Sequence, residues 1–332
     1  MDVQTSRRIV LLGKTGAGKS SLANTMSEDE VFMINHCPVT EVPPSYSATK
    51  FVNGRSLSFI DTPGFFDTHG SVKSLKADIV RCITECAPGP HAFLIVLKVE
   101  KFTEQEKEVI NEVCTHFSEA AFKYATCVFT HGDQLQKGMT IEEFVGQNVD
   151  LSDLVKKCGG RCHVVDNKYW KNSEGDVYRC NQFQVERLLN TLDQMIEANN
   201  GSFYTNEMLE TVKTNVQQEA EQIRQSSANV SQEEIIKQAK SKVFDRILIL
   251  SAGIATGVLL GAFLGLADMV TTAVATLKNP SDVSSLAATS KLDVAFAALK
   301  GMVNGFWRGF EAGEGSETTG EAINKTVQAL KK

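Results

Sequence analysis

The sequence predicts an α/β protein, with a doubly wound, mostly parallel sheet over residues 5–200 and a C-terminal helical extension behind it. Two observations predict this fold. Short apolar runs alternate with amphipathic stretches up to about residue 200, as strand–helix–strand units require. The 332-residue chain is also too long for one domain of ~100–200 residues, and its composition changes beyond residue 200, first to a polar segment and then to an uncharged one.

Strands are expected where apolar and β-branched residues cluster, and helices where apolar residues recur every three or four positions. The expected strands are Arg8–Leu12, Ser56–Ile60, Ala92–Leu97, Thr126–Thr130 and Cys162–Val165. The expected helices begin near Lys19 and then cover Ser74–Cys86, Thr103–Phe117, Thr140–Lys157 and Gln182–Ala198. Thr103 with Glu106 three residues later fits a capping box. In such a sheet, ligands bind at the carboxyl ends of the strands.

The first strand leads into a phosphate-binding loop of the pattern Gly-x-x-x-x-Gly-Lys-Ser. Its glycines let the backbone turn with the N–H groups pointing inward, and the following helix directs its positive end to the same place. Lys19 is expected to reach the β- and γ-phosphates as a catalytic cation, and the Ser20 hydroxyl to ligate Mg²⁺. The candidate nucleotide-binding residues here are Gly13, Lys14, Thr15, Gly16, Ala17, Gly18, Lys19, Ser20 and Ser21.

A second motif, Asp61-Thr62-Pro63-Gly64, follows the next expected parallel strand. An acidic residue at that strand end holds Mg²⁺ through water in phosphate-loop enzymes, and the Gly64 N–H is placed to sense the γ-phosphate during catalysis. Thr40, in the polar segment between the first helix and this strand, suits a switch threonine that completes the metal shell. Ser20, Thr40 and Asp61 are therefore the candidate metal ligands.

Base selection is expected at the end of the fourth strand, in His131-Gly132-Asp133. A carboxylate such as Asp133 can accept hydrogen bonds from guanine N1–H and the 2-amino group, which adenine does not offer. The His131 ring is placed to lie against the base. Asn167, directly after the last strand, is a second polar group for the base. GTP or GDP with Mg²⁺ is the predicted ligand.

The chain beyond residue 200 divides into three segments. Residues 201–246 are polar and predict a long helix or a helix pair that serves as a spacer or partner-facing arm. Residues 247–267 carry no charge and would span about 31 Å as one helix, which favours a membrane helix. Residues 268–332 form a helical tail that could return as a hairpin. A buried helix in a soluble oligomer is the alternative for the uncharged segment.

Residues flanking and within this uncharged segment support the membrane interpretation. Four basic residues, Lys237, Lys240, Lys242 and Arg246, precede it and keep the N-terminal domain on the cytosolic side. Glycines recur at every fourth position, which lets another helix approach closely. They are Gly253, Gly257, Gly261 and Gly265, and a second series follows at Gly301, Gly305, Gly309 and Gly313.

The overall composition excludes some functions. The net charge is −6 and the pI is about 5.6, with no basic block, so no nucleic-acid partner is expected. The N-terminus has no apolar leader, which predicts a cytosolic location for most of the protein. The eight cysteines are then expected as reduced, mostly buried thiols, since their spacings suit zinc poorly.

Five segments together resemble the immunity-associated nucleotide-binding GTPases, the GIMAP family. They are Gly13–Ser21, Asp61–Thr68, Cys86–Phe93, Phe102–Glu106 and Thr130–Asp133. The Pro-Gly-Pro-His-Ala-Phe part is specific, because nucleotide chemistry does not require it. The resemblance implies a septin-like GTPase domain, guanine nucleotide and Mg²⁺, nucleotide-dependent dimers or filaments, and for several members a C-terminal membrane anchor. It also assigns switch roles to Thr40 and Gly64, and guanine contacts to His131, Asp133 and Asn167.

Two departures from the family pattern bear on hydrolysis and base binding. Lys101 stands where members commonly have an arginine, so a residue that would act across a dimer keeps its charge but loses the bidentate fork. Asp166 replaces the first of two asparagines, which leaves Asn167 as the only amide at the base. No glutamine follows Gly64, because Phe65 stands there, and slow hydrolysis is expected.

The sequence therefore predicts a slowly hydrolysing GTPase that forms nucleotide-dependent homo- or hetero-oligomers on an intracellular membrane, with a cytoplasmic GTPase domain. Two alternatives stay open. One is an oligomeric scaffold, soluble or membrane-inserting, in which nucleotide acts only as an assembly trigger. The other is a receptor GTPase of the plastid-import type, against which Thr130–Asp133 and the Pro-Gly-Pro-His-Ala-Phe segment argue.

Overall fold

The computed structural model describes residues 6–32, 47–62, 64, 72–170, 176–226, 230–251 and 254–278. A six-stranded sheet with the order β2-β3-β1-β4-β5-β6 forms its centre. The strands are β1 (Arg7–Leu12), β2 (Ser47–Val52), β3 (Arg55–Asp61), β4 (Ala92–Lys98), β5 (Ala125–Thr130) and β6 (Cys162–Val164). All neighbouring pairs are parallel except β2 and β3, which form an antiparallel hairpin at the edge. The predicted doubly wound, mostly parallel sheet is confirmed.

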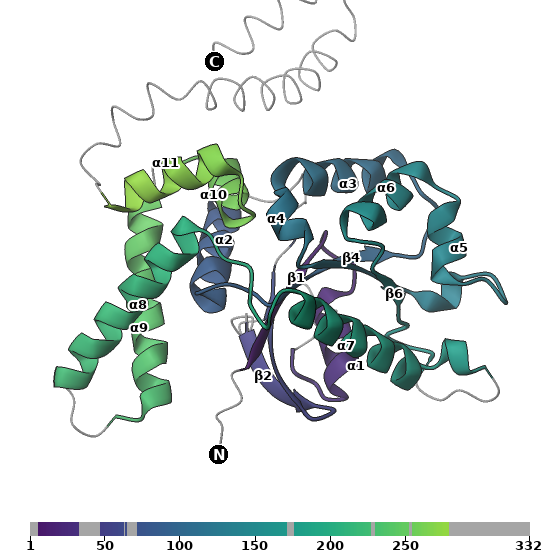
Figure 1. Ribbon diagram of the computed structural model, residues 1–332, viewed down its shortest axis with the longest axis horizontal. Helices are drawn as coiled ribbons and strands as arrows, with labels where there is room; N and C mark the ends of the chain where they lie inside the picture. Colours follow the sequence, from purple (N-terminus) through teal and green to yellow (C-terminus); the bar gives the residue numbers. More distant parts are fainter. Residues whose placement is uncertain are drawn as a thin grey trace, which may run out of the picture.

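Helices cover both faces of the sheet (Figure 1). The helices up to residue 200 are α1 (Lys19–Ser27), α2 (Val72–Cys86), α3 (Glu104–His116), α4 (Glu119–Phe122), α5 (Ile141–Gly146), α6 (Val149–Lys157) and α7 (Asn181–Ala198), with short 3-10 turns at η1 (Gly132–Gln134) and η2 (Val177–Arg179). Alternate β1 side chains enter opposite cores: Ile9 packs with α1 and α7, and Val10 with α2 and α3.

Two local predictions need correction. The expected helix Thr140–Lys157 is two helices, because the chain leaves α5 and restarts at Asn148, whose side chain accepts from the Leu151 N–H as the N-cap of α6. The edge strand β2 was not expected, because half of its residues are exposed and several are polar. The capping box at Thr103 and Glu106 is confirmed at the start of α3.

The polar segment after residue 200 forms the helix pair α8 (Glu207–Ser226) and α9 (Gln232–Leu250), as predicted. These two helices pack against each other, and α9 also packs on α2 (Figure 1). Apolar side chains of both helices belong to the same buried cluster as β4 and α2. Lys240 reinforces this contact, since its Nζ lies 3.1 Å from the carboxylate of Glu85. The pair is thus docked on the first 200 residues and is not a free arm.

The prediction of one helix over residues 247–267 is wrong. Its residues are divided between the end of α9, helix α10 (Thr256–Phe263) and the start of α11 (Ala267–Lys278). Gly265, at φ +89°, turns the chain between α10 and α11, which are bent by 110°. Among the described residues no single helix is long and apolar enough to cross a membrane, whereas α10 and α11 pass that test of length and composition only as a bent pair.

The glycines do allow close helix packing, but within the molecule. A Cβ on Gly261 would lie 2.1 Å from the sulfur of Met269, so the glycine admits α11 against α10. A Cβ on Gly265 would lie 2.3 Å from the Tyr204 hydroxyl oxygen. The second glycine series, Gly301 to Gly313, and the rest of the tail from residue 279 lie outside the described residues.

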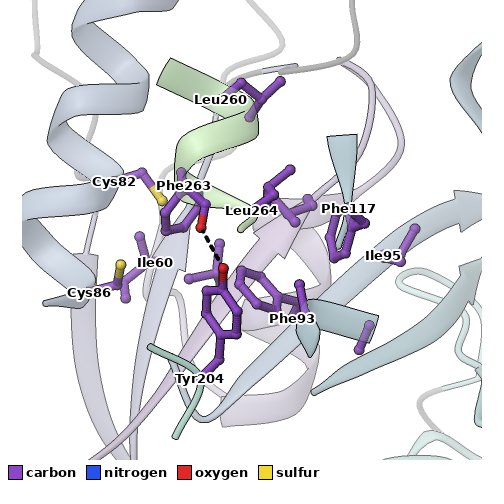
Figure 2. Packing of buried hydrophobic residues seen from close by; sticks show 14 of the residues in the cluster. Ile60, Cys82, Cys86, Phe93, Ile95, Phe117, Tyr204, Leu260, Phe263 and Leu264 are labelled. Carbon is purple, nitrogen blue, oxygen red and sulfur yellow. Dashed lines mark hydrogen bonds between the residues drawn. The ribbon is translucent and has the colours of Figure 1, made fainter. Parts of the chain in front are cut away.

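Helix α10 is seated in the core by the segment that follows α7 (Figure 2). The Tyr204 hydroxyl donates to the Phe263 carbonyl at 3.2 Å, and the Asn206 side chain donates to the Ala262 carbonyl at 2.9 Å. The Phe93 ring lies edge-on to both neighbours, 5.4 Å from Tyr204 and 5.9 Å from Phe263. Helix α10, the middle of the uncharged segment, therefore packs in the protein interior.

The Pro-Gly-Pro-His-Ala-Phe segment contacts Tyr204, the residue that holds α10 in the core. The Tyr204 N–H donates to the Pro90 carbonyl at 2.9 Å. A Cβ on Gly89 would lie 1.7 Å from the Tyr204 carbonyl oxygen, so only glycine permits this approach. His91 accepts the Arg8 backbone N–H at 3.0 Å. A motif that nucleotide chemistry did not explain thus positions the extension on the sheet.

Candidate functional site

The phosphate-binding loop connects β1 to α1 at the carboxyl end of the sheet, where the sequence placed it. Gly13 must be glycine, since a Cβ there would lie 2.4 Å from the Val96 carbonyl oxygen. Gly18 adopts φ +88° and starts α1. The buried Lys19 ammonium donates to the carbonyls of Gly13 and Lys14, each at 3.0 Å. The loop thus forms a ring of backbone around one cationic group, beside a helix N-terminus suited to anions.

The candidate metal ligands Ser20 and Asp61 are in contact, because the Ser20 hydroxyl donates to the Asp61 carboxylate. Burial raises the pKa of Asp61, although the Ser20 hydrogen bond and the Lys19 charge oppose the shift. Its second oxygen, Oδ1, is buried and has no hydrogen-bond partner among the described residues. A hydroxyl, a carboxylate and an orphaned oxygen fit a hard cation such as Mg²⁺.

Two other residues of the Asp61-Thr62-Pro63-Gly64 motif, Thr62 and Gly64, lie at the same end of β3 as Asp61. The Thr62 hydroxyl donates to the Leu11 carbonyl at 2.6 Å, which ties the motif to β1. Gly64 is buried next to this position. Thr40 lies outside the described residues.

Lys14 belongs to the phosphate-binding loop, but its side chain contacts acidic residues on another element. Its ammonium donates to the Glu106 carboxylate on α3 and lies 3.4 Å from the Glu100 carboxylate. Burial lowers the pKa of Lys14, but these two carboxylates outweigh it and the net pKa is raised. Lys14 thus contacts Lys19 in the loop through its backbone carbonyl, and the acidic residues through its side chain. Lys101, next to Glu100, is exposed.

The end of β5 is tied to the loop by Thr130, whose hydroxyl hydrogen-bonds with the Ala17 carbonyl at 2.8 Å and the Leu97 carbonyl at 3.2 Å. His131 follows in a left-handed conformation at φ +59° and is exposed. Gly132 lies under the Trp170 ring, since a Cβ there would approach the ring to 2.5 Å. Asp133 comes next and is partly exposed.

Asn167 also reaches the phosphate-binding loop. Its carbonyl oxygen accepts from the Thr25 hydroxyl at 2.8 Å, and its amide nitrogen lies 3.5 Å from the Gly18 carbonyl. A cavity of about 580 Å³ opens beside it, lined by Ser21, Asn24, Thr25, Asn53, Asn167 and Val185 among others. This volume is in the usual range of small-molecule sites.

Sequence reasoning missed three contributions to this site. Trp170 covers Gly132, Glu106 and Glu100 hold Lys14, and Asp166 contacts Asp133. Only Asp166 carried a signal, because it follows the last strand beside Asn167. The other contacts join residues far apart in the chain, which no local pattern marks.

Comparison with known proteins matches residues 7–224 to the model of the AIG1 family. Immune-associated nucleotide-binding protein 8 of Arabidopsis thaliana is 35% identical over 236 residues, which cover 68% of this chain and 64% of that protein. GTPase IMAP family member 8 of Mus musculus is 32% identical over 167 residues, 48% of this chain and 24% of that protein. The chain thus spans less than two thirds of either relative.

Among solved structures, the chain is similar to the crystal structure of Toc33 from Arabidopsis thaliana in complex with GDP and Mg²⁺. The two share 18% sequence identity with a TM-score of 0.42, over 57% of this chain and 84% of that chain.

Proposed function

The chain belongs to the AIG1 family, and we propose that it binds GTP and GDP with Mg²⁺ and hydrolyses GTP. One observation carries the proposal: the Lys19 ammonium, the Ser20–Asp61 pair and the Asp133 carboxyl group lie around one strand-end site. They meet three separate needs, which are phosphate charge, metal ligation and base selection.

In this proposal Ser20 and Thr40 hold Mg²⁺ directly, and Asp61 holds it through water. The metal neutralises charge on the β- and γ-phosphates when it is bound. Lys19 binds the same phosphates, the backbone N–H groups from Gly13 to Ser21 cradle them, and the Gly64 N–H contacts the γ-phosphate. His131, Gly132, Asp133 and Asn167 bind the base.

Calorimetry of the full chain with GDP, GTP and ATP tests the base assignment. We expect tight binding of guanine nucleotides and weak binding of ATP. Asp133→Asn should weaken GTP binding and favour xanthosine nucleotide, because the amide reverses one donor–acceptor pair. Asp153→Asn on α6, whose carboxylate forms an ion pair with Lys156 on the same helix, is the matched control. Equal affinity for ATP and GTP in the unaltered chain would end the guanine proposal.

We propose further that hydrolysis is slow and that assembly into dimers or larger oligomers controls it. The sequence has no glutamine after Gly64, so a water-orienting side chain is absent from that position. Lys101 is exposed on the loop before α3, where it can reach a second copy. The missing fork of an arginine limits how well it stabilises transition-state charge.

We propose, last, that the C-terminal region attaches the protein to an intracellular membrane. Its support is the uncharged composition of residues 247–267, the bent pair α10 and α11, and the exposed Arg246 and Ile249 at the end of α9. Alkaline carbonate extraction tests it. Retention in the membrane pellet is expected, and complete release of the full-length chain would favour α10 as a permanent core helix.

A further inference from the structure

Trp170 packs directly on the turn that carries the proposed base-binding carboxylate. This turn is η1, and a Cβ on Gly132 within it would lie 2.5 Å, 2.8 Å and 2.9 Å from three atoms of the Trp170 ring. Gly132 is buried and its φ lies outside the left-handed region, so the ring, and not the backbone conformation, requires glycine here. The ring thus sets how closely η1 can approach the segment after β6.

The Trp170 ring is held in place by its own neighbours. It is 5% exposed, the Tyr178 ring lies edge-on to it at 6.4 Å, and the guanidinium carbon of Arg179 lies 5.8 Å from its centroid. Arg179 also donates from Nη2 to the carbonyl oxygens of Leu135 at 2.7 Å and Gln136 at 3.0 Å, directly after η1. The ring therefore cannot move aside without disturbing the residues that hold the end of the turn.

Backbone hydrogen bonds hold η1 as well. The Gly132 N–H donates to the Val165 carbonyl at 3.0 Å, and the Asp133 N–H donates to Asp166 Oδ2 at 3.2 Å. Asp133 is thus tethered through its main chain, and its partly exposed carboxyl group extends from a turn that these hydrogen bonds and the Trp170 ring hold together. The packing of the turn therefore places the carboxylate.

Recognition of guanine through one carboxylate requires accurate placement of that carboxylate. Guanine N1–H and the 2-amino group offer two parallel donors, and each hydrogen bond weakens steeply when its angle is poor. Such an interaction needs its groups within about 0.5 Å of the productive geometry. A turn that shifts against the phosphate-binding loop would therefore lose hydrogen bonds to the base, even while the phosphates stay bound.

We propose that Trp170 is a positioning residue for base selection, because its ring holds η1 so that the Asp133 carboxylate meets both guanine donors at once. This inference rests on the proposed function. Trp170 acts through Gly132 and does not itself bind the nucleotide. Removal of the ring is therefore expected to reduce discrimination at the 2-amino group of the base, and not only the stability of the fold.

The test is calorimetry of the full chain with Mg²⁺ and either GDP or inosine diphosphate (IDP), which lacks the 2-amino group. The ratio of the Kd for IDP to the Kd for GDP reports the hydrogen bond between that group and Asp133. For the unaltered chain we expect a ratio of about tenfold or more, as for other hydrogen bonds to a charged group. Trp170→Leu should weaken GDP binding and bring the ratio below about threefold, because a misaligned hydrogen bond contributes little.

Gly132→Ala tests the same contact with one added methyl group, and so keeps the test valid even where Trp170→Leu folds poorly. It should also lower the ratio, because the Cβ forces the ring and η1 apart. Gly146→Ala on α5 is the matched control and should keep the ratio, since a Cβ there meets no atom within 4 Å. In the double variant the smaller leucine makes room for the methyl group, so the two losses in GDP affinity should not add.

Phe122→Leu separates positioning from stability. Phe122 is buried like Trp170 but precedes β5, at the end of that strand opposite to η1, so its replacement should lower the urea midpoint and leave the ratio unchanged. A ratio in Trp170→Leu and Gly132→Ala equal to that of the unaltered chain overturns this inference alone, and so do additive losses in the double variant. Equal affinity for GDP and IDP in the unaltered chain, or no guanine binding at all, overturns the proposed function as well.

Discussion

Replacing Phe263 by alanine tests whether the uncharged segment is part of the protein core. Phe263 has no exposed surface and packs against Phe93 and Tyr204 (Figure 2). Removing a fully buried phenylalanine ring costs both its transfer free energy and a cavity, about 3–5 kcal/mol in total. Since a domain is stable by only about 5–15 kcal/mol, this is a large fraction of the free energy of unfolding.

Urea denaturation of the full chain measures this loss. With a denaturant slope of about 2–3 kcal/mol per molar, the midpoint should fall by roughly 1–2 M. Ile249→Ala is the matched control, because Ile249 lies in the same uncharged segment but is 73% exposed. Its effect should stay within about 0.5 kcal/mol. Equal midpoints for Phe263→Ala and Ile249→Ala would refute the packing of α10 in the core.

Three further predictions concern the site and its supports. Lys14→Met should weaken nucleotide binding, because it leaves the carboxylates of Glu106 and Glu100 unpaired beside the loop. Lys107→Met, which removes a cation that faces Asp150 on α6, should leave the affinity unchanged, and equal affinities of the two variants in calorimetry would contradict this. The free energy of unfolding should fall as the pH drops from about 6.5 towards 4, because burial lowers the pKa of His91 and of His163 to about 4 and the unfolded chain therefore binds more protons in this range. Urea midpoints that do not change between these pH values would count against this prediction. Lys101→Arg should raise GTP turnover at high protein concentration more than in dilute solution, and turnover of the unaltered chain at roughly 1 s⁻¹ or faster would show that another residue stabilises the transition state.

The parts of the fold that the sequence predicted are those with a local cause. The inner strands β1, β4 and β5 are largely apolar because both of their faces are buried, and their positions agree with the prediction within a residue or two. The strand β2 has only one neighbour and exposes alternate residues such as Phe51, so it lacks that signal. The break at Asn148 depends on one side-chain cap inside an otherwise helical pattern.

In the candidate site, too, the parts with a local cause could be predicted from the sequence and the parts that depend on distant residues could not. The glycines, Lys19 and Ser20 belong to one short motif, and backbone geometry alone determines how they lie together. The contacts of Lys14 with Glu106 and of Asp133 with Asp166 join residues 92 and 33 positions apart. Such contacts depend on how α3 and the loop after β6 pack against the sheet, and the apolar periodicity of the sequence does not encode that packing.

The uncharged segment shows why composition cannot separate a membrane helix from a core helix. Both environments exclude water, and both favour the same side chains. The distinguishing information lies in the rest of the chain, which supplies the buried side chains that pack against α10. Phe93, Phe117 and Tyr204 would lose their cover if α10 left, and the hydrogen bonds that Tyr204 and Ser118 make to its last turn would be broken. A membrane contact that keeps this core intact must therefore use surface that does not pack against α10, such as the exposed Ile249 at the end of α9.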